Sequence, residues 1–385
     1  MSEDRFPRGR TAIVGTGTWG MGEAPGLSSL EIAVQASLAA LADAGLAPSD
    51  VDGVFGCLPD DMFAGLSISE YLGIAPRITD NNRVGGSSFQ THAILAAMAI
   101  EAGQCDVALI AYASNQRSAS GKLVSASTPF PYETRYKPLT PISAYALAAS
   151  RHMHQFGTTR EQLAEVAVSA RKWAQLNPDA FMRDDLSIED VLGARQVSSP
   201  LGVRDCCLVT DGGAAVVMVS AQRARDMRQK PVYLLGGAAE TTHRWISQMP
   251  DLTVSGTAEA ARRAYAQAGV SSADVDVVEL YDAFTINTIL MLEDLGFCPK
   301  GEGGRFVEDG AIAPGGQLPV NTNGGGLSCV HPGMYGLFTM VEATRQLNGT
   351  AGQRQVAGAE LAVSHGNGGV LSSQAVLVLG TGAAL

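Results

Sequence analysis

The chain has 385 residues, 46% of them hydrophobic, and a formal net charge of −11. This length and composition predict a globular protein with one large or two ordinary domains and a substantial core. The acidic balance argues against nucleic acid or an anionic membrane as the main partner, because both require a basic face on the protein.

The amino terminus and the cysteines indicate the compartment. The first ten residues, MSEDRFPRGR, are polar and lack the apolar core of a signal peptide, and no apolar stretch is long enough to span a bilayer. We therefore expect a cytoplasmic protein without a membrane segment. The six cysteines show no C-x-x-C pair and no zinc spacing, so we expect reduced thiols and no metal site in this chain.

The amino-terminal part alternates between strands and helices. Its hydrophobic pattern predicts, in order, a strand at 11–16, a helix at 28–44, a strand at 50–56, a helix from about 85 to 101 and a buried strand at 107–112. Ser28 or Ser29 caps the first helix and Gly45 ends it. The pattern is typical of an α/β protein.

Residues 113 to about 200 have a different composition. They contain prolines at 129, 131, 138 and 141, predicted helices at 142–156 and 160–176, and Asp-rich connections. We interpret this segment as an inserted lobe. A strand at 214–220 then follows Asp211-Gly212-Gly213.

The second half repeats the plan of the first. Residues 40–52, ALADAGLAPSDVD, match residues 264–276, AYAQAGVSSADVD, without a gap. The unit at 85–112 has a counterpart at 324–364, whose strand is expected at 359–364. Chance similarity of two helix–strand units is the alternative. A repeat of this length predicts two similar α/β domains with a shared site, at 1–225 including the lobe and at 226–385.

Two segments have the composition of an active site. Residues 321–336 read NTNGGGLSCVHPGMYG, and Tyr281 to Phe284 lie about forty residues upstream. Glycines let the backbone approach a ligand closely, while His331 and Tyr335 supply a ring nitrogen and a phenol. The structural alternative is a glycine-rich turn that leads into a helix at 333–347, ended by Asn348-Gly349.

The sequence resembles the thiolase superfamily over nearly its whole length, and within it the sterol-carrier-protein-X and lipid-transfer-protein branch. The segments that carry the resemblance are DCC at 205–207, DGGAA at 211–215, VELYDAF at 278–284, LGFCPKGEG at 295–303, residues 321–336 and GQRQV at 352–356. The resemblance implies a five-layered αβαβα fold built from two duplicated βαβαβαββ halves. It also implies a tight homodimer and acyl-CoA substrates, with coenzyme A as part of the substrate and no further cofactor.

Both thiolase cysteines are missing. Alignment with the family places Gly86 at the position of the nucleophilic cysteine, next to Ser87 and Ser88. A serine needs a base within hydrogen-bond reach to attack a thioester, and His92 is either that base or an ordinary buried histidine. The loop of the second cysteine reads SHGNGG at 364–369, with Gly366 near the cysteine position. Chemistry through an acyl-cysteine is therefore disfavoured.

The remaining polar residues suit a retro-aldol cleavage of a β-hydroxyacyl-CoA, which needs a base, an acid and donors to the thioester oxygen. The resemblance assigns His331 and a backbone N–H near residues 366–369 as donors. We assign Tyr281 as the base, helped by Asp282 unless Asp282 only holds the loop, and Tyr335 as the acid. His365 is a further candidate. Either tyrosine is alternatively an aromatic that fills a groove. The expected substrate and oxyanion loops contain Gly86, Ser87, Ser88, Asn323, Gly325, Gly366, Asn367 and Gly368.

The related aldolases act on coenzyme A thioesters of steroid side chains, in complex with a small OB-fold and zinc-ribbon protein. By resemblance we expect such a partner in an α2β2 assembly, with any zinc held by the partner. Two other functions remain open, a thiolase or C-acyltransferase with an altered site and a non-catalytic acyl-CoA or lipid binder. The residues of the lobe do not specify the acyl group.

Overall fold

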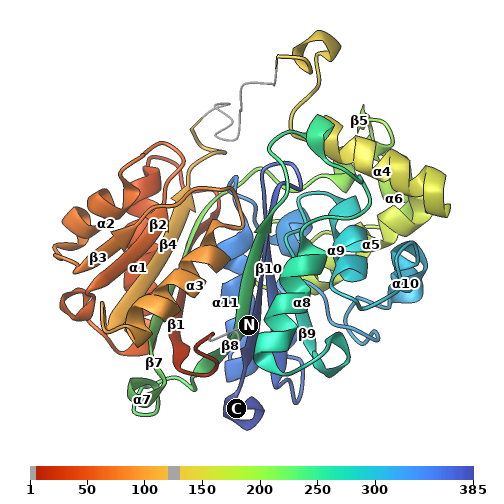
Figure 1. The fold of residues 1–385 in the computed structure, drawn as a ribbon. Coiled ribbons are helices and arrows are strands. Elements are labelled where there is room, and N and C mark those ends of the chain that lie inside the picture. The colour runs from red at the N-terminus through yellow and green to blue at the C-terminus, as the bar shows by residue number, and fades with distance from the viewer. Residues whose placement is uncertain (1–5, 120–130) are drawn as a thin grey trace.

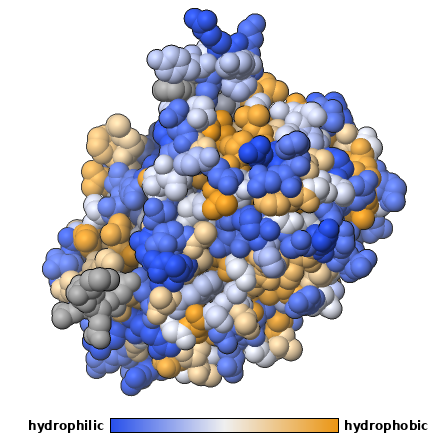
Figure 2. All heavy atoms as spheres, turned by 45° about the vertical axis from the view of Figure 1, so that its right-hand side comes forward, coloured by the Kyte–Doolittle hydropathy of each residue, from blue (hydrophilic) through white to orange (hydrophobic). Residues whose placement is uncertain are grey.

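The computed structural model describes residues 6–119 and 131–385. The polar stretch at residues 1–5 and a part of the expected lobe, residues 120–130 with Pro129, lie outside the described residues. None of the helices within residues 6–119 and 131–385 combines the length and the hydrophobicity that a membrane-spanning helix needs. Figure 2 shows hydrophilic and hydrophobic side chains interspersed over one face of the molecule.

In the described part of the chain, nine strands form one mixed sheet in the order β3-β2-β4-β7-β1-β8-β11-β10-β9 (Figure 1). These strands are β1 (Thr11–Gly22), β2 (Gly53–Cys57), β3 (Ile78–Asp80), β4 (Val107–Ser114), β7 (Asp211–Ser220), β8 (Val232–Thr241), β9 (Val277–Glu279), β10 (Leu361–Gly368) and β11 (Ser373–Gly380). β1 and β8 pair only through Ala12 with Tyr233 and Ile13 with Val232. The sheet therefore consists of two groups of strands that join at one end.

The helices complete five layers. They are α1 (Ser29–Ala44), α2 (Ala64–Leu72), α3 (Ser88–Glu101), α4 (Ile142–Phe156), α5 (Arg160–Gln175), α6 (Ile188–Leu192), α7 (Ala221–Ala224), α8 (Thr257–Ala268), α9 (Thr285–Asp294), α10 (Gly303–Phe306) and α11 (Gly336–Asn348). α3 and α11 contact each other and strands of both groups, whereas α1 covers β1, β7 and β4 and α8 covers β8 and β11. This is the αβαβα arrangement expected from the sequence.

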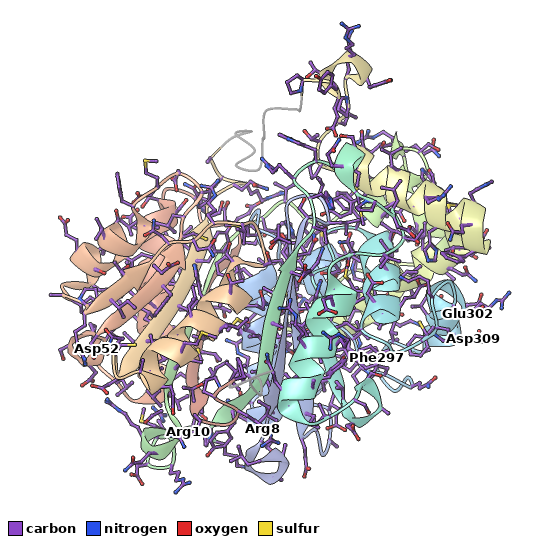
Figure 3. All side chains as sticks on the ribbon, in the orientation of Figure 1. Arg8, Arg10, Asp52, Phe297, Glu302 and Asp309 are labelled. Atoms are coloured by element: carbon purple, nitrogen blue, oxygen red, sulfur yellow. The ribbon has the colours of Figure 1, made fainter. Side chains whose placement is uncertain are left out.

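The internal repeat extends to individual side chains. α1 and α8 both end at a left-handed glycine, Gly45 and Gly269. Asp52, labelled in Figure 3, accepts hydrogen bonds from the backbone N–H groups of Asp106 and Val107 at the start of β4. Its counterpart Asp276 does the same for Glu360 and Leu361 at the start of β10. The boundary near residue 225 stays a prediction.

The expected lobe contributes α4, α5, α6 and the two-stranded sheet of β5 (Gln196–Ser198) and β6 (Leu201–Gly202). α4 and α5 both pack against α9, which follows the Tyr281 segment. Buried His152 of α4 lies 3.0 Å from Glu293 of α9, measured from Nε2 to Oε1. The lobe is thus attached to the carboxy-terminal half beside the candidate site.

The helix expected at 333–347 begins later than predicted. Residues 325–329 form a single π-helical turn, and the continuous helix α11 starts at Gly336. Gly333 has a positive φ of 90°, which a regular helix excludes. The backbone N–H of Met334 donates to the hydroxyl of Tyr112 instead of to a helical carbonyl. Tertiary contacts therefore keep residues 330–335 as an irregular loop.

Candidate active site

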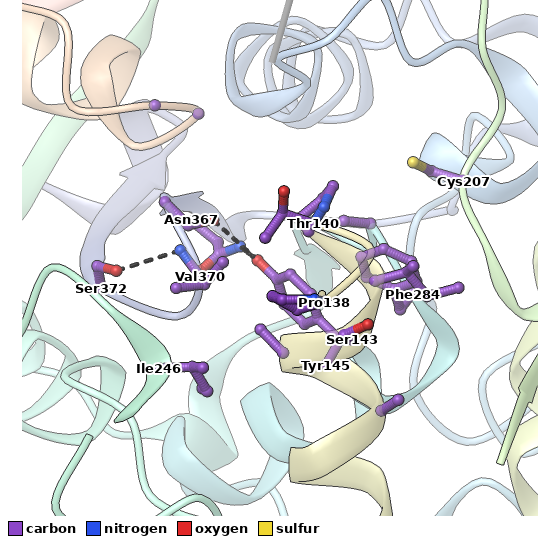
Figure 4. A pocket seen from close by; sticks show the side chains of 18 of the residues that line it. Pro138, Thr140, Ser143, Tyr145, Cys207, Ile246, Phe284, Asn367, Val370 and Ser372 are labelled. Atoms are coloured by element: carbon purple, nitrogen blue, oxygen red, sulfur yellow. Dashed lines mark hydrogen bonds between the residues drawn. The ribbon is translucent and has the colours of Figure 1, made fainter. Parts of the chain in front are cut away.

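A cavity of about 1370 Å³ lies where the two halves and α4 meet. Its lining includes Gly85, Gly86, Tyr145, Cys207, Tyr281, Phe284, His331, Gly333, Asn367 and Gly369. Figure 4 shows part of this wall, with Tyr145 between Phe284 and Asn367. The expected residues Gly86, Tyr281, His331 and Asn367 are thus brought together although they are distant in sequence.

Tyr281 and His331 form a hydrogen-bonded pair at the cavity wall. The Tyr281 hydroxyl oxygen lies 3.1 Å from His331 Nε2, and Tyr281 as a whole residue is only 5% exposed. Burial raises the pKa of Tyr281 well above its ordinary value and lowers the pKa of His331 from 6.5 to about 4. Both side chains are therefore neutral at pH 7. The Tyr281 hydroxyl also lies 3.5 Å from the backbone oxygen of Gly333, so His331 Nε2 is the nearer of two acceptors within its reach.

The ring of Tyr281 occupies the position that a side chain at residue 86 requires. A Cβ atom on Gly86 would lie 1.9 Å from Tyr281 Cε2 and 2.7 Å from the backbone oxygen of Asn367. Carbon atoms in contact are about 3.5–4.0 Å apart, so no side chain fits there without a shift of the ring. We call this position the Gly86 slot. It is filled by a phenol that comes from a segment almost two hundred residues away.

Asp282 lies behind the cavity and holds the glycine loop. Its carboxylate accepts hydrogen bonds from the backbone N–H groups of Gly326, at 2.6 Å, and Leu327, at 3.3 Å. Burial raises the pKa of Asp282 to about 7. A Cβ atom on Gly325 would lie 2.1 Å from the Asp282 carboxylate, which explains the glycine at 325. This geometry supports the loop-holding alternative for Asp282.

Tyr335 also lies behind Tyr281. It is fully buried and does not line the cavity, and its hydroxyl donates to Asn323 Oδ1 at 2.8 Å. The same Asn323 oxygen accepts from the backbone N–H of Gly325 at 2.7 Å. The rings of Tyr335 and Tyr281 meet edge to face with centroids 5.9 Å apart. In this structure Tyr335 therefore supports the Tyr281 ring and the glycine loop rather than reaching the cavity.

His365 points away from the cavity as well. Its Nδ1 lies 3.5 Å from the backbone N–H of Tyr281, and its Nε2 lies 3.0 Å from Gln374 Oε1 and 3.1 Å from Thr257 Oγ1. Burial lowers the pKa of His365 to about 4. The neighbouring Gly366 needs to be small, because a Cβ atom there would lie 2.1 Å from Gln90 Oε1.

The two serines beside the Gly86 slot have structural partners. Ser87 donates to Ser373 Oγ at 2.9 Å, and the Ser88 oxygen accepts from the backbone N–H of Val84 at 2.9 Å. His92 faces Asp80, with Nε2 3.5 Å from its carboxylate. Neither serine lines the cavity. Gly368 packs so tightly on Val84 that its Cβ would lie 1.9 Å from the Val84 carbonyl oxygen.

Tyr145 and Cys207 are among the cavity residues that were not assigned from the sequence. Tyr145 comes from the lobe and belongs to no motif, so only the packing of α4 reveals it. Cys207 lies within a family motif, but nothing in the motif indicates that it faces the cavity. Burial raises the pKa of the Cys207 thiol well above its ordinary value, so a thiolate is scarce at neutral pH. Among residues 6–119 and 131–385, no cluster of three or more His, Cys, Asp or Glu side chains is arranged to hold a metal.

The layered fold, with a tyrosine ring in the Gly86 slot, defines a thiolase-like protein without the nucleophilic cysteine. Residues 238–381 match the family described as Thiolase C-terminal domain-like. The 17-hydroxy-3-oxo-4-pregnene-20-carboxyl-CoA lyase of Mycobacterium tuberculosis is 36% identical over 96% of this chain and 99% of that protein. The acetyl-CoA acetyltransferase of Methanothermobacter thermautotrophicus is 34% identical over 95% of this chain and 98% of its own length.

A solved structure agrees with these relatives. The Ltp2–ChsH2(DUF35) aldolase has a TM-score of 0.88 and 33% identity, covering 97% of this chain and 98% of the matched chain. The chain therefore belongs to the thiolase superfamily, in the sterol-carrier-protein and lipid-transfer-protein branch.

Proposed function

We propose that the protein is a carbon–carbon lyase that cleaves a β-hydroxyacyl-CoA by a retro-aldol reaction. The products are a ketone or aldehyde and a shorter acyl-CoA. The acyl group is a steroid side chain or another hydrophobic group, in keeping with relatives named as a pregnene-carboxyl-CoA lyase and a steroid side-chain-cleaving aldolase. The cavity of about 1370 Å³, with Phe284, Met334 and Leu252 among its lining residues, has room for such a group.

One observation carries the proposal, namely the Tyr281 ring in the Gly86 slot. A thiolase reaction needs a nucleophile there to accept the acyl group. Here a phenol hydrogen-bonded to His331 lies in its place. A retro-aldol reaction needs no covalent intermediate, only removal of the β-hydroxyl proton and stabilisation of the thioester enolate.

The pair moves the proton in a concerted step. The β-hydroxyl proton passes to the oxygen of Tyr281 while the Tyr281 proton passes to His331 Nε2. The electrons of the broken O–H bond form the π bond of the carbonyl at Cβ, and the Cα–Cβ electrons pass into the thioester enolate. The proton then returns through Tyr281 to Cα. With the pKa of His331 at about 4, a proton held there at pH 7 costs roughly 4 kcal/mol, so it resides there only briefly.

A partner protein is part of this proposal. The similar solved structure is described as an aldolase together with ChsH2(DUF35). We propose that this chain forms a homodimer and binds a small OB-fold and zinc-ribbon protein in an α2β2 assembly. Co-purification of the chain with the product of a neighbouring gene, followed by mass measurement of the complex, tests this assembly.

An acyl-transfer reaction is the second candidate. It is favoured by the acetyltransferase relative and by Cys207 in the cavity wall. The two reactions differ in their need for a thiol. Labelling with iodoacetamide leaves a retro-aldol enzyme active, whereas full inactivation through one labelled cysteine would favour acyl transfer.

The central experiment compares the purified chain, with and without its partner, on β-hydroxyacyl-CoA and β-ketoacyl-CoA substrates, with products followed by mass. Tyr281→Phe removes the hydroxyl but keeps the ring in the Gly86 slot. We expect it to fold and to bind thioesters while cleavage falls at least about tenfold, since acid–base groups contribute roughly 10²–10⁴-fold. Normal turnover by Tyr281→Phe would remove this residue from the mechanism.

A further inference from the structure

Tyr145 brings a second phenol into the cavity from the lobe. It lies on α4, is 2% exposed and packs on the ring of Phe284 with centroids 4.5 Å apart. Figure 4 shows its hydroxyl directed toward Asn367. The same Asn367 adjoins Tyr281, because its backbone oxygen borders the Gly86 slot that the Tyr281 ring fills. Tyr145 and Tyr281 therefore flank Asn367 at one end of the cavity.

A chain of hydrogen bonds with one direction links the two tyrosines. The backbone N–H of Tyr281 faces His365 Nδ1, so the His365 proton resides on Nε2 and is donated to Gln374 Oε1 at 3.0 Å. The Gln374 amide nitrogen then donates to Asn367 Oδ1 at 2.8 Å. The Asn367 amide nitrogen in turn donates to the Tyr145 hydroxyl oxygen at 2.8 Å. Each side-chain orientation follows from the one before it.

This direction leaves the Tyr145 hydrogen available. The Tyr145 oxygen accepts from Asn367, so its own hydrogen must point elsewhere. Its partner in the structure is the backbone oxygen of Gly369 at 3.2 Å, which is long for an O–H···O bond with its usual 2.7–2.8 Å. Burial raises the pKa of Tyr145 to about 12, so the hydroxyl keeps its proton at neutral pH. A substrate oxygen in the cavity offers a better acceptor than Gly369.

We infer that Tyr145 donates its hydroxyl hydrogen to the thioester oxygen of bound acyl-CoA, and that Asn367 is the positioning residue that keeps this hydrogen free. The inference rests on the proposed function for its ligand class. Tyr281 accepts the proton of the β-hydroxyl group, and Tyr145 donates a hydrogen bond to the thioester oxygen, which becomes negative in the enolate. A phenol donor at this oxygen stabilises the enolate without forming a bond to carbon.

Binding of two matched ligands tests the inference without relying on cleavage. Hexanoyl-CoA has a thioester oxygen, and S-hexyl-CoA is the corresponding thioether without it. Calorimetry gives the ratio of their affinities for wild type, Tyr145→Phe and the control Tyr136→Phe, whose ring lies at the cavity edge and is 86% exposed. We expect the preference for the thioester to fall about 2- to 12-fold in Tyr145→Phe, the range for one hydrogen bond, and to persist in Tyr136→Phe.

Asn367→Asp tests the positioning role by reversing one hydrogen bond. A carboxylate at 367 still accepts from Gln374, but it accepts the Tyr145 hydrogen instead of donating to the Tyr145 oxygen. We expect the thioester preference to fall as in Tyr145→Phe, with no further fall when the two substitutions are combined. A purely structural role for Asn367 predicts an equal loss of affinity for both ligands.

The results separate this inference from the proposed function. An unchanged thioester preference in Tyr145→Phe, or no such preference in wild type, overturns the inference. So does a further loss when Asn367→Asp is added to Tyr145→Phe. A wild-type chain that shows the Tyr145-dependent preference but cleaves no β-hydroxyacyl-CoA instead refutes the lyase reaction. Circular dichroism and thermal melting confirm that each variant is folded.

Discussion

Replacing Gly86 with alanine places a methyl group in the space of the Tyr281 ring. The new Cβ would lie 1.9 Å from Tyr281 Cε2, whereas contacting carbons are about 3.5–4.0 Å apart. The ring therefore has to move by roughly 1.5 Å or more. Overpacking of this kind costs about 1–3 kcal/mol, so we expect the free energy of unfolding to fall by that amount. Cleavage falls at least about tenfold, because the shift separates Tyr281 from His331.

A double-mutant cycle measures this clash directly. Tyr281→Ala removes the ring, so the cost of Gly86→Ala is reduced in that background, with a coupling energy of about 1–3 kcal/mol. The contact with the backbone oxygen of Asn367, at 2.7 Å, remains and keeps the relief incomplete. Urea unfolding of the four proteins gives the coupling. Tyr233→Ala is the control, because it also removes a buried tyrosine ring, but one that lies at the start of β8, where Tyr233 pairs with Gly380.

Two results would contradict a contact between the Gly86 slot and the Tyr281 ring. Gly86→Ala with wild-type stability and cleavage would show that the Tyr281 ring does not occupy the Gly86 slot. The second result would be a coupling energy near zero between Gly86→Ala and Tyr281→Ala, the same as between Gly86→Ala and the control Tyr233→Ala. It would show that residues 86 and 281 are not in contact. If the cycle holds, Gly86→Cys combined with Tyr281→Ala makes room for a thiol, and an acyl adduct found by mass spectrometry supports the alignment of this slot with the thiolase nucleophile.

Three further outcomes follow from buried groups. The pKa of His365 is lowered from 6.5 to about 4, so on acidification the unfolded chain binds the proton first and the free energy of unfolding falls by about 3 kcal/mol between these pH values. His365→Gln removes this part of the pH dependence, as measured by urea unfolding at a series of pH values. An equal pH dependence of the free energy of unfolding in wild type and His365→Gln would contradict the prediction. Arg354→Leu leaves the buried Glu342 carboxylate without the guanidinium that lies 2.7 Å from it, so we expect the free energy of unfolding to fall by about 3–5 kcal/mol. Adding Glu342→Gln restores part of this loss, because it removes the unpaired charge. A loss under about 1 kcal/mol in Arg354→Leu would show that the ion pair is not buried as described. Cys207→Ala keeps cleavage within about threefold because the thiol is protonated, whereas a larger loss would favour acyl transfer.

Much of the fold is encoded locally. The helix α1 was predicted within one residue, because Ser28 caps it and a left-handed Gly45 ends it through contacts a few residues apart. The match between residues 40–52 and 264–276 predicted two similar units, and Asp52 and Asp276 indeed hold equivalent strand starts. Caps, turns and hydrophobic periodicity act over one or two helical turns, so they can be read directly from the residues.

The α/β class, the internal repeat and the family motifs could be read from the residues alone, as could the candidates Tyr281 and His331 and the missing cysteine at Gly86. The folded chain was needed to show that the Tyr281 ring fills the Gly86 slot and that the Tyr335 hydroxyl donates to Asn323. It also brought Tyr145 to Asn367, 222 residues away in the chain. Side-chain contacts between residues so far apart in sequence depend on how the layers of helices and sheet pack against one another, and local sequence patterns do not indicate that packing.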